Sequence, residues 1–275
     1  DVGGLLTTEN VKHEANSVSQ KTETTSWTAP DISKWKDRTF MGYHREDGQV
    51  GTQNVWLFFP LAFCENRNIE LLKDVFEKEL SFHKASKQRQ LLRNLINGAP
   101  EDTAVAEIEE EQAIFDNIEV KFITHQGGCG GIRQDSVSLS KLLAGYVNNP
   151  NVAGATVLSL GCQNLQIDIF KNALAEKSAA IKKPVLIYEQ QQEGTVDEML
   201  AKIIKDSFEG IKKANQIKRQ PAPISKLKMG LECGGSDGFS GISANPALGY
   251  ASDILAAVGG SPILSEFPEL CGVEQ

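Results

Sequence analysis

The sequence predicts an α/β fold: a mainly parallel sheet with helices on both faces, in a Rossmann-like three-layer arrangement. Two observations predict it. Short apolar runs typical of buried strands alternate along the chain with segments of helical period. The intervening segments are also long enough to be crossover helices between parallel strands.

The expected elements follow in chain order. The segment 65–81 illustrates the helical period, because Ile69, Leu72, Phe76 and Leu80 recur at spacings of three and four. The expected strands are 55–63, 118–124, 152–160, 184–188 and 228–231. The expected helices are 65–81, 84–96, 135–146, 165–175, 196–214 and 247–258.

The first 38 residues differ from the rest, because they are rich in Ser and Thr and lack hydrophobic periodicity. We therefore predict that residues 1–38 are a linker or the tail of a preceding domain, extended or poorly ordered. Residues 39–275 are predicted to form one α/β domain.

Composition excludes several classes of function. The net charge is −8 without a basic block, which argues against nucleic acid or an anionic membrane surface as a partner. The longest apolar run, 55–64, is far shorter than the roughly 18 residues of a membrane span. The five cysteines are an odd number without CxxC pairs, which favours reduced thiols in the cytoplasm over a disulfide framework.

Three segments rich in glycine and cysteine each follow a predicted strand: 125–131 (HQGGCGG), 161–164 (GCQN) and 233–241 (CGGSDGFSG). The carboxyl ends of parallel strands form the ligand edge of such a sheet, so we expect these loops to meet there. Cysteine thiolates and imidazole are suitable ligands for iron or zinc. Ordinary tight turns and small core cysteines are the alternative. Neither a GxGxxG nor a GxxxxGK[ST] motif is present, which argues against nucleotide chemistry.

Longer motifs resemble one known family, the altronate/galactarate dehydratases. The resemblance covers about residue 40 to the end. It is carried by 40–54 (FMGYHREDGQVGTQN), 142–146 (LLAGY), 149–154 (NPNVAG), the loops at 161 and 233, and 263–269 (ILSEFPE). Two departures concern substrate and metal: Gln53 and Gln163 stand where the family usually has Arg and Glu. The resemblance implies a dehydratase domain at 39–275 that lacks the family's N-terminal SAF domain and is truncated at its C-terminal end.

The resemblance implies removal of water from an aldonate or aldarate, giving a 2-keto-3-deoxy acid. It further implies a divalent metal, Fe²⁺ or alternatively Mn²⁺, and we expect a cytoplasmic homo-oligomer with a small-molecule sugar-acid substrate. The candidate metal ligands are His125, Cys129, Cys162 and Cys233, with Glu266 and Glu269 as alternates. The candidate catalytic residues are Tyr43, His44, Arg45, Ser236 and Asp237. The candidate substrate-binding residues are Arg45, Asn54, Gly234, Gly235 and Asn245.

Each assignment has a structural alternative. His125 could be a hydrogen-bonded loop residue, and Arg45 could belong to a surface salt bridge. Core packing is the stronger interpretation for Cys64 and Cys271. At the level of the whole chain, the alternatives are a sugar-acid binding or oligomerisation module without activity of its own, and a related sulfo-lyase.

Overall fold

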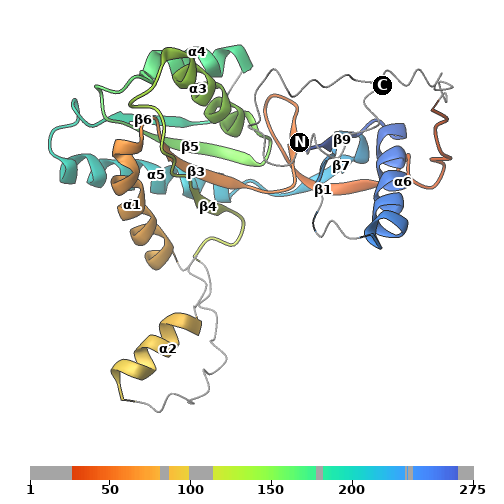
Figure 1. Cartoon of the computed structure of the whole chain (residues 1–275), viewed down its shortest axis with the longest axis horizontal. Coiled ribbons are helices and arrows are strands. Elements are labelled where there is room, and N and C mark those ends of the chain that lie inside the picture. The colour runs from red at the N-terminus through yellow and green to blue at the C-terminus, as the bar shows by residue number, and fades with distance from the viewer. Residues whose placement is uncertain are drawn as a thin grey trace, which may run out of the picture.

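The computed structural model describes residues 27–80, 87–98, 114–177, 182–232, 234 and 238–265. Its centre is a parallel sheet with the strand order β4-β3-β5-β6 (Figure 1). The strands are β3 (Val55–Pro60), β4 (Glu119–Phe122), β5 (Val152–Ser159) and β6 (Val185–Glu189). The predicted α/β fold with a parallel sheet is therefore confirmed.

Helices cover both faces of this sheet. One face carries α1 (Asn66–Glu79) and α5 (Val196–Asn215), and the other carries α3 (Arg133–Asn148) and α4 (Ile167–Lys177). Strand β3 supplies both cores, because successive side chains of a strand point to opposite faces. Trp56 and Phe58 pack with α1 and α5, whereas Leu57 and Phe59 pack with α3 and α4.

The helices begin where their sequences favour it. Helix α5 starts with a capping box in which Thr195 and Glu198 exchange hydrogen bonds between side chain and backbone N–H. The predicted helices 65–81, 135–146, 165–175 and 196–214 lie within a few residues of the observed ones. The helix expected at 84–96 is α2 (Lys87–Ile96). None of the described helices is both long and apolar enough to cross a membrane.

A second group of strands lies outside the central sheet. Strands β2 (Val50–Gly51), β1 (Thr39–His44) and β7 (Gln220–Pro223) form an antiparallel sheet in that order. The short 3₁₀ helices are Phe63–Glu65, Ile224–Lys226 and Ser240–Ile242.

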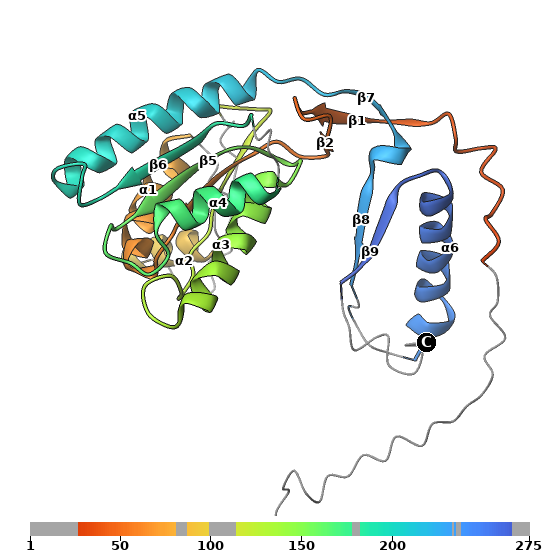
Figure 2. The same ribbon diagram turned by 90° about the horizontal axis from the view of Figure 1, so that it is seen from above.

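Strands β8 (Lys228–Leu231) and β9 (Ser261–Leu264) form a two-stranded parallel sheet, joined by α6 (Ala244–Ala257), as Figure 2 shows. The expectation that 228–231 joins the central sheet was wrong. Its partner in the fold is β9, a strand that the sequence patterns did not reveal. The physical reason is that an apolar run predicts a strand but not the neighbour with which the strand pairs.

Candidate functional site

The carboxyl edge of the central sheet brings three cysteine-bearing loops together. Cys64 follows β3, Cys129 lies in the loop after β4, and Cys162 follows β5. These strands are neighbours in the order β4-β3-β5. The prediction that three loops meet at this edge therefore agrees with the topology for the loops of Cys129 and Cys162. It does not hold for the third loop, which follows β8 outside the central sheet.

Backbone hydrogen bonds fix the middle loop against the two others. The N–H of Phe63 donates to the carbonyl of Gly127 (3.0 Å), and the N–H of Leu165 donates to the carbonyl of Gly128 (2.8 Å). Gly128 has a φ of +90°, and a Cβ there would lie 1.9 Å from the carbonyl oxygen of Leu61. Only glycine permits this close approach, so the loop of Cys129 is held between those of Cys64 and Cys162.

The thiols of these loops are close to one another. The Cys64 and Cys129 side chains are near enough to interact, and Cys162 adds a smaller electrostatic interaction. Desolvation raises the pKa of Cys64, and its interactions with Cys129 and Cys162 raise it further. Cys64 and Cys162 are exposed and Cys129 is half-buried, so the thiols are accessible from solvent. The interpretation of Cys64 as a packing residue was wrong; its position just after an apolar strand was the signal that placed it here.

His125 precedes Cys129 in the same loop, but both of its ring nitrogens have partners. Nε2 is 2.8 Å from the carbonyl oxygen of Pro60, and Nδ1 accepts from the N–H of Gly127 (3.2 Å). The Pro60 contact requires a proton on Nε2, which leaves Nδ1 as the acceptor. Metal ligation by His125 would therefore break one of these bonds. In the described part of the chain, no group of three or more His, Cys, Asp or Glu side chains surrounds a position for a single metal ion.

Two buried polar residues complete this edge. Gln163 is 2% exposed, and its side chain accepts from the N–H of Gly161 and donates to the Ser159 hydroxyl, so it shapes the Cys162 loop. Glu65 is fully buried. One of its carboxylate oxygens accepts from Asn68 (2.7 Å), while the other has no partner. Burial raises the pKa of Glu65, and the hydrogen bond from Asn68 partly offsets this.

Arg45 lies at the opposite, amino-terminal edge of the sheet. Its guanidinium donates to the carbonyls of Pro150 (2.7 Å), Gln53 (3.2 Å) and Asn151 (3.3 Å) and to the side-chain oxygen of Asn54 (3.0 Å). These acceptors directly precede β3 and β5. The six residues of β3 span roughly 20 Å at about 3.3 Å per residue. Arg45 is thus a buried clamp between loops, far from the thiols.

The other candidates near Arg45 share its structural setting. Asn54 is buried and donates to the carbonyls of Asn117 and Ala214, both at 2.9 Å. The Tyr43 hydroxyl donates to the side chain of Asn117 (2.7 Å), and a ring nitrogen of the exposed His44 is 3.1 Å from the carbonyl of Pro221. The structure therefore does not bring Tyr43, His44, Arg45 and Asn54 to the edge that carries the thiols.

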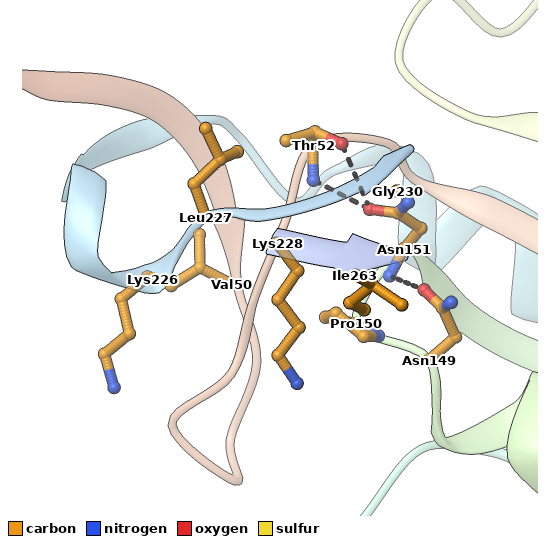
Figure 3. Close-up of a pocket in the computed structure, with 10 residues that line it drawn as sticks. All are labelled: Val50, Thr52, Asn149, Pro150, Asn151, Lys226, Leu227, Lys228, Gly230 and Ile263. Carbon is orange, nitrogen blue, oxygen red and sulfur yellow. Dashed lines mark hydrogen bonds between the residues drawn. The ribbon is translucent and has the colours of Figure 1, made fainter. Parts of the chain in front are cut away.

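A cavity of about 230 Å³ lies at this amino-terminal edge, beside β8 and β9 (Figure 3). Lys226 and Lys228 project along it, while Thr52 and Asn151 are joined by hydrogen bonds on its other side. The lining residues are Val50, Thr52, Asn149, Pro150, Asn151, Lys226, Leu227, Lys228, Gly230 and Ile263. They include two cations and no acid, so the cavity attracts anions.

Lys183 is a further cation at this edge. Its ammonium donates to the carbonyls of Val147 (3.1 Å) and Asn149 (2.6 Å) at the end of α3. Burial lowers the pKa of Lys183 to about 8, and the charge of Arg45 contributes, while that of Asp47 acts in the opposite direction. The carbonyls at a helix C-terminus suit a cation, so Lys183 also stabilises the end of α3.

The remaining candidates lie around the third loop. Gly234 is exposed, and Asn245 is exposed in the first turn of α6. Cys233, Gly235, Ser236, Asp237, Glu266 and Glu269 lie outside the described residues. Their proposed roles stay predictions.

Comparison with known proteins finds two family domains that match this chain. The profile described as "D-galactarate dehydratase/Altronate hydrolase, second domain" matches residues 42–215, and "D-galactarate/Altronate dehydratase, C-terminal" matches residues 224–275. The first match contains the whole central sheet and the three thiol loops.

Individual relatives agree with these matches. Altronate dehydratase of Bacillus subtilis (strain 168) is 35% identical over 87% of this chain and 41% of its own length. Altronate dehydratase of Escherichia coli (strain K12) is 32% identical over the same shares of the two chains. Galactarate dehydratase (L-threo-forming) of Escherichia coli (strain K12) is 38% identical over 44% of this chain and 24% of its own length. The chain thus spans about two fifths of the length of the two altronate dehydratases. The match to the second-domain profile covers the whole central sheet, and the C-terminal profile matches the residues that follow. This chain therefore belongs to the D-galactarate dehydratase/altronate hydrolase family.

Proposed function

We propose that this chain is part of a sugar-acid dehydratase that removes water from an aldonate or aldarate such as altronate or galactarate. The observation that carries the proposal is the second-domain match over residues 42–215, which spans the sheet and its thiol-bearing edge. The names of the relatives support the reaction type and the class of substrate. The product of such a step is a 2-keto-3-deoxy acid.

The chemistry of this reaction sets two demands. A proton alpha to a carboxylate is very weakly acidic, so its removal produces a dianion that must be stabilised. The β-hydroxyl must also be protonated as it leaves, which requires a general acid. A bound divalent metal, for which we propose Fe²⁺ or Mn²⁺, would supply the Lewis acid that meets the first demand.

The donor set at the carboxyl edge suits such a metal in its chemistry. Cys129 and Cys162 supply soft thiolate ligands from adjacent loops. Cys233 follows β8, which lies outside the central sheet, so we do not assign it to this donor set. We assign His125 a positioning role, because its two hydrogen bonds orient the loop of Cys129. Ser236 and Asp237, which follow Cys233 in the sequence, remain the proposed hydroxyl-binding and proton-transfer groups.

We assign structural roles to the candidate residues at the amino-terminal edge of the sheet. Arg45 and Asn54 fix the segments that enter β3 and β5, and Tyr43 is bonded to Asn117 beside them. We therefore propose that these residues maintain the scaffold, and that the substrate carboxylate binds at the thiol edge.

Turnover assays test the proposal directly. The anaerobically purified protein is incubated with D-altronate, galactarate or sulfolactate, and the release of a 2-keto-3-deoxy acid or of sulfite is measured. We expect turnover of a sugar acid that chelators abolish and that Fe²⁺ or Mn²⁺ restores. Calorimetric binding of the sugar acid without turnover would instead favour a binding module, and sulfite release would favour a sulfo-lyase.

We further propose that the protein acts in the cytoplasm as a homo-oligomer on a small-molecule substrate, without nucleic acid or membrane partners. The unpaired thiols of Cys64, Cys129 and Cys162 support a reducing compartment. Light scattering measures the assembly, and a monomer mass at working concentration would contradict this part of the proposal.

A further inference from the structure

Two adjoining cavities lie where the start of β8 meets the amino-terminal edge of the central sheet. Their volumes are about 230 and 280 Å³. Both are lined by Lys226 and Lys228, just before and at the start of β8, and by Val50 of β2 and Pro150 of the loop before β5. The walls come from segments far apart in the sequence, so the space exists only in the folded chain.

The two lysines give this space a positive charge in a protein whose net charge is −8. The Lys226 ammonium donates to the carbonyl of Gly48 (3.3 Å). Among the ion pairs of the described residues, none involves Lys226 or Lys228. Asp47 lines the larger cavity, but its two oxygens accept from the N–H (3.1 Å) and the side-chain amide (2.8 Å) of Gln49. Within the described part of the chain, the lysines therefore lack an anionic partner.

The loop 149–151, which lines the smaller cavity, is also compatible with an anion there. Arg45 and Lys183 donate to its three backbone carbonyls, so cations compensate the negative ends of these peptide groups. The side-chain oxygen of Asn151 accepts from the N–H of Thr52 (2.7 Å), as Figure 3 shows. This bond fixes the orientation of the amide and leaves its NH₂ group as a donor for a ligand.

The arrangement of the two lysines indicates the shape of the anion. They are two residues apart, and Leu227 between them is extended, which places their Cα atoms about 7 Å apart. In Figure 3 both side chains project in the same direction and their ammonium groups stand apart. Because like charges repel, this arrangement suits two separate negative groups better than one compact ion. Leu227 and Ile263 in the same lining suit a short hydrocarbon body between those groups.

We propose that Lys226 and Lys228 bind a small organic dicarboxylate in the cavity at the start of β8. This site lies at the amino-terminal edge of the sheet, opposite the thiol loops. The inference goes beyond the proposed dehydration and does not depend on it. A ligand in this cavity contacts both the start of β8 and the loop 149–151, so its binding stabilises their contact.

Calorimetric titration with malonate, succinate and adipate tests the site and its spacing, with acetate and inorganic phosphate for comparison. We expect adipate to bind more tightly than malonate or acetate, because only the longer dicarboxylate reaches both ammonium groups. Lys228→Met and Lys226→Met should each weaken adipate binding by about tenfold, whereas Lys228→Arg should keep most of the affinity. Lys171→Met is the matched control, because Lys171 is exposed on α4, lies outside both linings and carries the same charge; this variant should bind like the parent.

Melting curves give a second readout, because a ligand that binds only the folded state raises Tm. Adipate should raise the Tm of the parent but not that of the Lys226→Met/Lys228→Met double variant. Both lysines are exposed, so their replacement removes no core contact, and circular dichroism checks the fold. Unchanged adipate affinity in the folded double variant would overturn the site, as would the absence of adipate binding by the parent. Phosphate or malonate binding as tight as that of adipate would overturn the dicarboxylate.

The failures of this inference and of the proposed function are distinguishable. Adipate binding by a protein that turns over no sugar acid would refute the dehydratase and leave the dicarboxylate site standing. Sugar-acid turnover by a protein that does not bind adipate would refute the dicarboxylate site and leave the dehydratase standing.

Discussion

Replacing Arg45 with alanine separates its structural role from a role in substrate binding. Arg45 is 9% exposed, and its guanidinium donates four hydrogen bonds, to Pro150, Gln53, Asn151 and Asn54. A hydrogen bond contributes about 1 kcal/mol net, so losing four costs roughly 4 kcal/mol. Water that enters the vacated space recovers part of this. We therefore expect the free energy of unfolding to fall by about 2–4 kcal/mol.

Arg133→Ala is the matched control for this experiment. Arg133 is exposed and donates to one backbone carbonyl, that of Asn164 (2.7 Å), so its loss should cost about 1 kcal/mol or less. Urea unfolding followed by circular dichroism measures both variants. If Arg45→Ala unfolds at the same urea concentration as the parent but no longer binds the sugar acid, the structural role of Arg45 is refuted and Arg45 binds substrate.

Three further predictions concern packing and pH. Gly210→Ala in α5 should lower the free energy of unfolding by up to about 2 kcal/mol, because the added Cβ would lie 2.2 Å from the Trp56 ring. Gly145→Ala in α3 should raise the free energy of unfolding by up to about 1 kcal/mol, because the added Cβ meets nothing within 4 Å. Urea unfolding measures both variants, and a stability change of the same sign in the two would contradict the close packing of Gly210 against Trp56. The pKa of Lys183 is about 8 in the folded protein, below the unfolded value of about 10.4, so its charged form is disfavoured on folding. The free energy of unfolding of the parent should therefore rise between about pH 8 and 10 relative to that of Lys183→Met. Parallel pH profiles of the two proteins would refute the lowered pKa. The pKa of Glu65 is raised instead, so stability should fall as pH rises above its unfolded pKa of about 4.3. Glu65→Gln should lack that fall, and a profile identical to the parent's would show that burial does not affect this carboxyl.

The central fold could be predicted because its signals are local. The apolar run at β3 predicts a strand buried on both faces, and the leucines and isoleucines of α1 predict a helix with one apolar side. The antiparallel strands β1 and β7 gave no such signal. They are short and partly exposed, and they pair across about 180 residues of sequence, a contact that no local pattern encodes.

The candidate site could be predicted only in part, for the same reason. Loops that follow parallel strands meet at one edge, so the meeting of the Cys129 and Cys162 loops follows from strand order alone. Residue type did not predict which side chains already have hydrogen-bond partners in the folded chain. His125 has the chemistry of a ligand, but Pro60 and Gly127 occupy its ring nitrogens.

The sequence by itself determined the α/β class, the family motifs and the edge at which cysteine loops gather, because periodicity and loop position depend on neighbours along the chain. Only the tertiary structure decided that Arg45 is a clamp at one edge while Cys64 joins the thiols at the other. These two residues lie 19 positions apart in the sequence, yet β3 carries them to opposite ends of the sheet. Hydrogen-bond saturation and strand pairing depend on contacts between distant segments, and those exist only once the chain has folded.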